Sequence, residues 1–189
     1  MYSHLRDTTL VGKRLELLKG LVPKLSRVAV LWNPQSKISA ISWKEIQLPA
    51  RELGLQLHSM EARGASDFDK AFEDATRARA GALAVMPDPL FGGNLKRIAD
   101  LAAKNRLPAM YPGSDFMDAG GLMSYGTNTP DLFRRAATYV DKILKGRTPA
   151  DLPVEQPMKF EFIISLPAAK KIGLTIPPNV LVRATKVIR

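Results

Sequence analysis

Polar side chains with binding chemistry follow short apolar runs of the sequence, at the points where these runs end. They are Asn33, Ser36, Asp88, Ser114, Asp115 and Tyr125. Amides and hydroxyls donate and accept hydrogen bonds, the Asp88 carboxylate offers a negative charge to an ammonium group or to hydroxyls, and tyrosine adds a ring with a polar tip. Such groups suit a small polar ligand. Each is also an ordinary turn residue, and for any single one that role is the commoner explanation.

The usual catalytic arrangements are missing from the sequence. It contains no cysteine, and its two histidines, His4 and His58, do not have metal-ligand spacing. There is no phosphate-binding glycine loop, no GxSxG turn and no HExxH motif. A hydrolase or transferase that uses Asp88 or Asp115 stays open as an alternative, although the sequence offers no partner base. We therefore predict no metal and no cofactor, and at this point both a binding protein and an enzyme stay open.

The apolar runs alternate with segments in which apolar residues have helical spacing. The predicted strands are 27–32, 55–60, 82–86 and 107–111, and the predicted helices between them are 37–53, 66–79 and 90–105. This alternation is typical of βα units on a mostly parallel sheet. Ligands of such sheets bind beyond the carboxyl ends of the strands. The sequence thus predicts a three-layer, Rossmann-like α/β fold with the polar residues along one edge.

Further elements are predicted on either side of this core. They are a helix at 13–21, a strand at 120–126, a helix at 131–145, a strand at 159–164 and a helix at 167–172. Ser66 and Thr129 are expected to cap helices. Pro49 should kink or end its helix early, because its ring clashes with the carbonyl four residues back. The helix at 131–145 has a wider apolar face than one sheet can cover, so we expect it to need a second partner.

Length and charge exclude several classes of protein. A chain of 189 residues with 46% hydrophobic and 24% charged residues suits one globular domain. The net charge is +10, but Lys and Arg occur singly or in pairs and without interleaved aromatic residues, which argues against nucleic-acid binding. No apolar run approaches the roughly 18 residues that cross a membrane, and charges interrupt the amino-terminal stretch where a signal peptide would be apolar.

Three long stretches resemble the ABC transporter substrate-binding proteins whose relatives take up aromatic and other amino acids. They are LVGKRLELLKGLVPKLSRVAVLWNP (10–34), GGLMSYGTNTPDLFRRAATYVDKILKGRTPADLPVEQPMKFEFIISL (120–166) and AAKKIGLTIPPNVLVRATKVI (168–188). The resemblance covers nearly the whole chain. It implies the type I periplasmic-binding-protein fold, in which two Rossmann-like lobes are joined by crossing strands and hold a solute between them.

The resemblance matches the chain to the second, carboxyl-terminal lobe. It implies that residues 1–189 form a single substrate-binding lobe, to which 10–129 and 150–189 belong. The helix at 130–147 would pack on the first lobe, which together with a signal peptide is missing from this chain. That arrangement would account for the wide apolar face of the helix.

The function implied by the resemblance is binding without a chemical step. The six polar side chains would face the cleft between the lobes, and a membrane permease would recognise the closed form. The implied partners are a small-molecule solute, possibly an amino acid, and an ABC permease, with no nucleic acid and no membrane insertion. The implied location is the periplasm, whereas the chain as written would stay in the cytoplasm. A cytoplasmic effector-sensing domain, as in repressors of this fold, stays open as an alternative.

Overall fold

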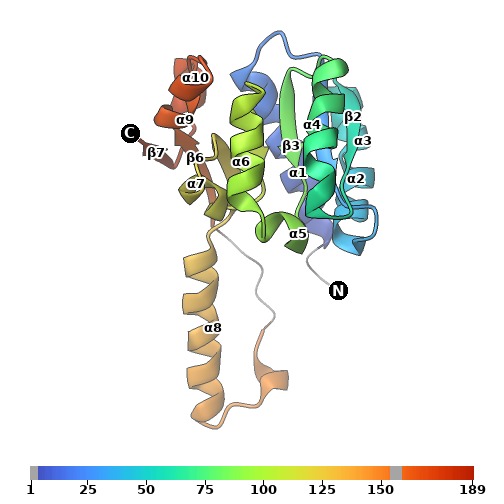
Figure 1. The fold of residues 1–189 in the computed structure, drawn as a ribbon. Helices are drawn as coiled ribbons and strands as arrows, with labels where there is room; N and C mark the ends of the chain where they lie inside the picture. The colour runs from blue at the N-terminus through green and yellow to red at the C-terminus, as the bar shows by residue number, and fades with distance from the viewer. Residues whose placement is uncertain (1–3, 154–158) are drawn as a thin grey trace.

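A seven-stranded sheet forms the middle layer of the computed structural model, which describes residues 4–153 and 159–189 (Figure 1). The strands are β1 (Arg27–Trp32), β2 (Gln56–Glu61), β3 (Ala82–Val85), β4 (Ala109–Tyr111), β5 (Met123–Thr127), β6 (Phe160–Ser165) and β7 (Lys186–Ile188). All six predicted strands are present. The seventh, β7, lies in a tail for which the sequence predicted no strand.

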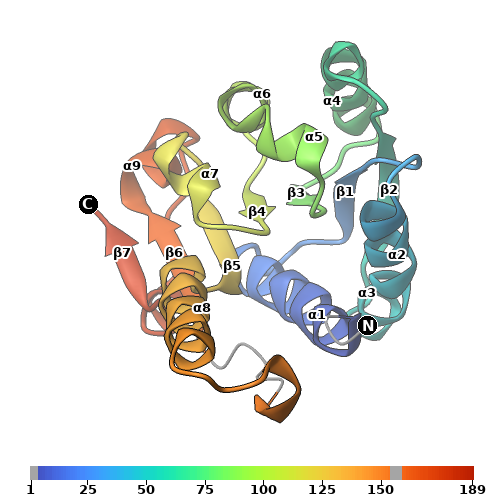
Figure 2. The same ribbon diagram turned by 90° about the horizontal axis from the view of Figure 1, so that it is seen from below.

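The strand order is β2-β1-β3-β4-β5-β6-β7. Strands β1 to β5 pair in parallel, β6 is antiparallel to β5, and β7 is parallel to β6. The mostly parallel, helix-covered α/β sheet predicted from the sequence is therefore confirmed. We call the edge formed by the carboxyl ends of β1, β3, β4 and β5 the carboxyl edge, onto which Figure 2 looks.

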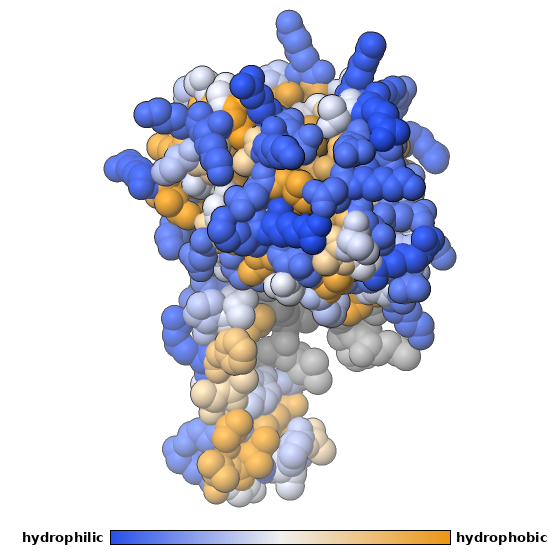
Figure 3. Space-filling view, in the orientation of Figure 1, coloured by the Kyte–Doolittle hydropathy of each residue, from blue (hydrophilic) through white to orange (hydrophobic). Residues whose placement is uncertain are grey.

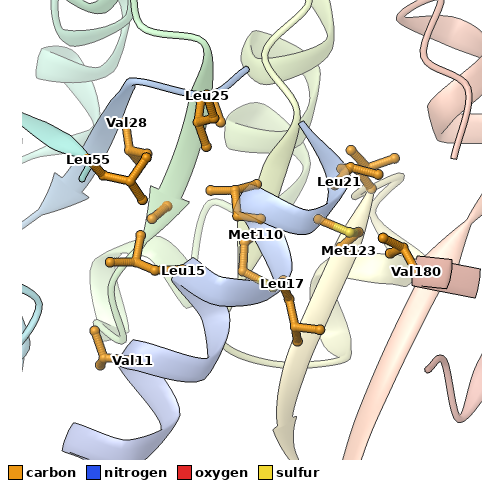
Figure 4. Close-up of a cluster of buried hydrophobic side chains, with 14 of the residues drawn as sticks. Val11, Leu15, Leu17, Leu21, Leu25, Val28, Leu55, Met110, Met123 and Val180 are labelled. Carbon is orange, nitrogen blue, oxygen red and sulfur yellow. The ribbon is translucent and has the colours of Figure 1, made fainter. Parts of the chain in front are cut away.

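Three helices cover one face of the sheet: α1 (His4–Leu21), α2 (Lys37–Glu45) and α3 (Gln47–Glu52). Apolar residues of α1 at helical spacing, among them Val11, Leu15 and Leu18, are fully buried. Figure 4 shows α1 lying across the sheet, where its side chains meet Met110 and Met123 from neighbouring strands. The helix begins well before residue 13, where the sequence predicted its start.

The opposite face is covered by α4 (Phe68–Arg77), α5 (Pro89–Gly92), α6 (Leu95–Lys104) and α7 (Asp115–Asp118). The buried side chains of α4 follow the i, i+3, i+4, i+7 pattern of an amphipathic helix: Phe68, Ala71, Phe72 and Ala75. Ser66 is not the cap that the sequence predicted. The Asp67 carboxylate instead accepts the backbone N–H groups of Arg63 and Gly64, and these bonds lower the pKa of Asp67.

Two predicted helices are each divided in the structure. The segment 37–53 breaks at Ile46, between α2 and α3. Pro49 explains the break, because the carbonyl four residues before it belongs to Glu45, the last residue of α2. The segment 90–105 divides at the Gly92-Gly93 pair, where α5 ends before α6 begins.

Helix α8 (Thr129–Leu144) leaves the carboxyl edge after β5 and extends away from the rest of the molecule (Figure 1). Its cap is Asn128 rather than the predicted Thr129, since the Asn128 Oδ1 accepts the Asp131 N–H at 2.7 Å. None of its side chains is buried, and Phe133 and Leu144 are 72% and 82% exposed. Figure 3 shows this apolar surface in orange on the extension. Its packing on another lobe stays a prediction.

After α8 comes a short 3-10 turn at Pro149–Asp151, and residues 154–158 lie outside the described residues. After β6 come α9 (Leu166–Lys171) and α10 (Pro178–Leu181). Buried Ala169 and Val180 of these helices join the apolar cluster that includes Leu15 and Leu18 of α1. None of the helices in the described ranges is long and apolar enough to cross a membrane.

Candidate functional site

Asn33 follows β1 directly and is held by its own turn. Its Oδ1 accepts the Gln35 N–H at 3.0 Å, and its backbone N–H donates to the Ser39 hydroxyl at 2.8 Å. Ser36 caps α2, where its hydroxyl accepts the Ser39 N–H at 3.5 Å. Both predicted residues are half-buried, and their oxygens are engaged in forming the turn that leads from strand to helix.

Asp88 lies beside Asn33 at the neighbouring strand end. Its Oδ1 caps α5 by accepting the Leu90 N–H at 2.9 Å, and it also accepts from the Asn33 Nδ2 at 3.4 Å. Its other oxygen, Oδ2, is buried and has no hydrogen-bond partner among the described residues. A buried carboxylate oxygen without a partner is costly, and a cationic group or a hydroxyl would offset that cost.

Ser114 and Asp115 follow β4 and begin α7. Ser114 is half-buried, and its hydroxyl makes no capping bond; Asp115 is exposed. No hydrogen bond joins either of them to Asn33 or Asp88 in the part of the chain that the structure describes. They share the carboxyl edge with the other predicted residues but do not form one contact cluster with them.

Tyr125 lies in β5 near the point where the chain turns into α8. Its ring packs on Phe160 and Phe162 of β6, with centroids 6.1 Å and 6.5 Å away. Its backbone carbonyl accepts a hydrogen bond from the Arg14 Nε at 2.7 Å. Tyr125 as a whole residue is half-buried, so part of it is accessible to solvent.

Two features near this edge were not predicted as functional. Arg14 is buried on α1. In the sequence, the feature that could have drawn attention to it is a basic residue between the apolar positions Val11 and Leu15. Trp32 is half-buried at the end of β1 and stacks on Trp43 of α2, with ring centroids 5.2 Å apart and planes 7° from parallel. Nothing in the sequence pairs the two rings, because they come from different layers.

A separate hollow of about 330 Å³ lies between the end of β2 and α4. Ser59, Glu61, Arg63, Asp67, Lys70 and Asp74 supply its polar lining. None of the predicted site residues lines it. Across the described residues, no group of three or more His, Asp or Glu side chains could hold a metal ion.

A mostly parallel sheet with polar groups at its carboxyl edge is the architecture of a ligand-binding α/β domain. The family of ABC transporter substrate binding proteins matches residues 3–188. The chain belongs to this family, whose members bind solutes and are not enzymes. The hydrolase or transferase alternative at Asp88 or Asp115 is therefore set aside.

Individual relatives share this fold. A tyrosine-binding protein of Clostridioides difficile (strain R20291) is 22% identical over 168 residues, which are 89% of this chain and 48% of that protein. A conserved domain protein from Vibrio cholerae O1 biovar eltor has a TM-score of 0.82 and 25% identity, covering 94% of this chain and 60% of that one. The ABC domain in complex with L-Trp from Streptococcus pneumonia has a TM-score of 0.82 and 23% identity, covering 95% and 62%.

This chain thus spans about half the length of the tyrosine-binding relative and about three fifths of each of the two solved structures. The similarity to the solved structures extends over nearly all of the present chain. The carboxyl edge described above therefore belongs to a fold that these larger proteins share.

Proposed function

We propose that this chain binds an amino acid at its carboxyl edge and serves an ABC import system by presenting the ligand to the permease. The six residues predicted from the sequence, from Asn33 to Tyr125, would supply this lobe's contacts. The observation that carries the proposal is the buried Asp88 Oδ2, which has no partner among the described residues.

The environment of Asp88 suits an ammonium group. One carboxylate oxygen is already held by the Leu90 N–H and the Asn33 amide, so the side chain is fixed before a ligand arrives. The second oxygen can accept a charge-assisted hydrogen bond, which is stronger than a neutral one. A preorganised acceptor also costs little entropy on binding.

The relatives suggest which amino acids to test first. One is named a tyrosine-binding protein and another was solved with L-Trp. Both ligands carry an α-ammonium group, which Asp88 would accept, and an aromatic ring. Tyr125, a half-buried residue, lies at the same edge, and its ring would offer a stacking surface.

Isothermal titration calorimetry with L-tryptophan and L-tyrosine tests this function. We expect Asp88→Asn to weaken binding by about 10- to 100-fold, because the amide keeps the shape and the α5 cap but removes the charge that the ammonium needs. N-acetyl-L-tryptophan should bind the unaltered chain as poorly as L-tryptophan binds the variant.

Asp118→Asn is the matched control, since this exposed carboxylate lies in the neighbouring short helix α7 and should leave affinity unchanged. Equal affinity of the unaltered chain and Asp88→Asn, or full binding of the N-acetyl compound, would show that Asp88 does not bind an ammonium group. The absence of any binding by the unaltered chain would count against amino-acid binding by this lobe alone.

We also propose that residues 130–147 pack on the other lobe of a two-lobed protein, which encloses the ligand between its lobes. The exposed apolar side chains of α8 and the greater length of the relatives support this arrangement. By the family resemblance the complete protein would work in the periplasm, and fractionation of cells that express the natural gene tests that location.

A further inference from the structure

Arg14 is a charged residue in the apolar face of α1, and it is only 6% exposed. Its helix neighbours Val11, Leu15 and Leu18 are all core residues. Removing an ionised guanidinium from water is expensive unless hydrogen bonds compensate for the lost hydration. The hydrogen bonds that Arg14 makes are therefore what keeps its charged side chain in this buried position.

Two of those partners are backbone carbonyls at the carboxyl edge. The Arg14 Nε donates to the carbonyl of Tyr125 at 2.7 Å, and one terminal nitrogen donates to the carbonyl of Pro112 at 3.2 Å. These carbonyls are 98 and 111 residues away in the sequence. One side chain thus connects α1 to the ends of two neighbouring strands.

The sheet itself does not hold those two strand ends together. The paired residues of β4 and β5 end at Tyr111 and Ser124, and the next residue of the first strand, Pro112, has no N–H to donate. Arg14 makes its bonds just beyond this point. It therefore takes the place of the missing strand pairing between Pro112 and Tyr125.

Gly126 shows how closely the two segments approach. A β-carbon at this position would collide with the carbonyl oxygen of Pro112 and would lie 3.9 Å from the Arg14 guanidinium. Glycine is the residue that permits this approach. The two segments held here carry candidate ligand residues, since Ser114 and Asp115 follow Pro112 on one of them and Tyr125 belongs to the other.

We propose that Arg14 is a positioning residue for ligand binding, which sets the separation between residues 112–115 and residues 125–127. The role in ligand binding rests on the proposed function, whereas the role in holding the two segments does not. Arg14 acts through the backbone of these segments. Because α8 begins four residues after Tyr125, these bonds also lie close to the point where the chain leaves the sheet.

The test compares Arg14→Lys with the unaltered 189-residue chain. Lysine keeps the charge but lacks the planar fork that reaches both carbonyls. We expect about tenfold weaker binding of L-tryptophan by calorimetry, together with faster amide hydrogen exchange confined to residues 113–115 and 125–127. Lys13→Gln is the control, because Lys13 lies beside Arg14 in the same helix turn at a partly exposed position, where it pairs with Glu16.

Gly126→Ala provides a second variant in case Arg14→Lys does not fold. It separates the same two segments while Arg14 is unchanged, so it should reproduce the local exchange and the loss of affinity. Unchanged exchange in these segments, or faster exchange with unchanged affinity, would overturn the positioning role. If the unaltered chain binds no amino acid, the proposed function fails, and the exchange result alone supports or overturns the role of Arg14.

Discussion

Asp88 and Arg14 are charged groups of opposite sign that the fold treats differently. Arg14 donates to two backbone carbonyls, whereas Asp88 uses only one of its oxygens and leaves the other buried without a partner among the described residues. A group whose hydrogen bonds lie within the protein contributes to structure, and a buried group with unused capacity is suited to a ligand. This difference supports a framework role for Arg14 and the ligand contact proposed for Asp88.

Other single residues depart from simple expectations. His58 of β2 has a buried Nε2 with no partner among the described residues. Trp32 donates from its indole nitrogen to the Ser59 hydroxyl at 2.7 Å, so its position at the end of β1 combines stacking with a polar contact. Burial raises the pKa of Tyr111, which keeps its phenol neutral beneath α7.

Phe72 and Phe133 offer a direct test of packing at single residues. Phe72 of α4 is 1% exposed, so Phe72→Ala should reduce the free energy of unfolding by about 3–5 kcal/mol. Phe133 of α8 is 72% exposed, so Phe133→Ala should change it by less than about 0.5 kcal/mol. Urea unfolding monitored by tryptophan fluorescence measures the free energy of unfolding of both variants. Similar decreases in the two variants would contradict the burial of Phe72 and the exposure of Phe133.

The junction between α8 and the sheet is held by polar contacts rather than by apolar packing. Asp131 in the first turn of α8 pairs with Lys159, which precedes β6, at 3.2 Å, and with Arg135 at 3.2 Å. Asn128, the cap of α8, donates to the Glu161 carboxylate at 2.6 Å. Helix and returning strand are thus joined at their start, and this junction sets how α8 leaves the carboxyl edge.

The pKa of Asp131 follows from this junction. Hydrogen bonding to Lys159, followed by that to Arg135, holds the pKa of this carboxyl below its ordinary value. A depressed pKa stabilises the folded junction above the unfolded value of about 3.9, and the contribution is lost as the pH falls through the folded pKa. We therefore expect Lys159→Gln to raise the pKa of Asp131 towards its ordinary value, measured by NMR titration of the carboxyl carbon.

Lys145→Gln is the control for this titration, because Lys145 pairs with Asp141 at the far end of the same helix. It likewise removes one positive charge, at the far end of α8, and leaves the junction intact. A pKa of Asp131 that moves equally in both variants would mean that the net charge of the chain, and not the contact with Lys159, controls the carboxyl.

At the scale of the whole molecule, stability is unevenly distributed. The sheet and its two helical layers enclose two clusters of buried apolar side chains, while α8 contributes no buried residue. Backbone hydrogen bonds that are not covered by tertiary packing open more easily. Among the longer helices, α8, which forms the extension in Figure 1, is therefore expected to be the least protected against hydrogen exchange.

Hydrogen exchange measured by mass spectrometry tests this distribution. Amides of α8 should exchange orders of magnitude faster than those of α1, whose residues Leu15 and Leu18 are fully buried. Equal protection of the two helices would show that α8 is covered in solution. In a longer chain that includes the other proposed lobe, protection of α8 should rise while that of α1 stays the same.

The sequence by itself determined the parallel sheet, the helices on its faces and the strand ends where polar residues gather. These features follow from periodicities of two and 3.6 residues and from the chain order of alternating strands and helices, all of which are local. The same rules brought Asn33 and Asp88 to neighbouring strand ends. They also predicted the early end of the helix before Pro49, since that clash involves residues only four apart.

The tertiary structure decided which of these residues meet. The burial of Arg14 depends on carbonyls 98 and 111 residues away, and the Trp32–Trp43 stack depends on how α2 lies on the sheet. The strand β7 pairs with β6, so a short tail with no clear pattern becomes part of the sheet. Contacts between distant segments arise from packing of the whole chain, and no local spacing specifies them.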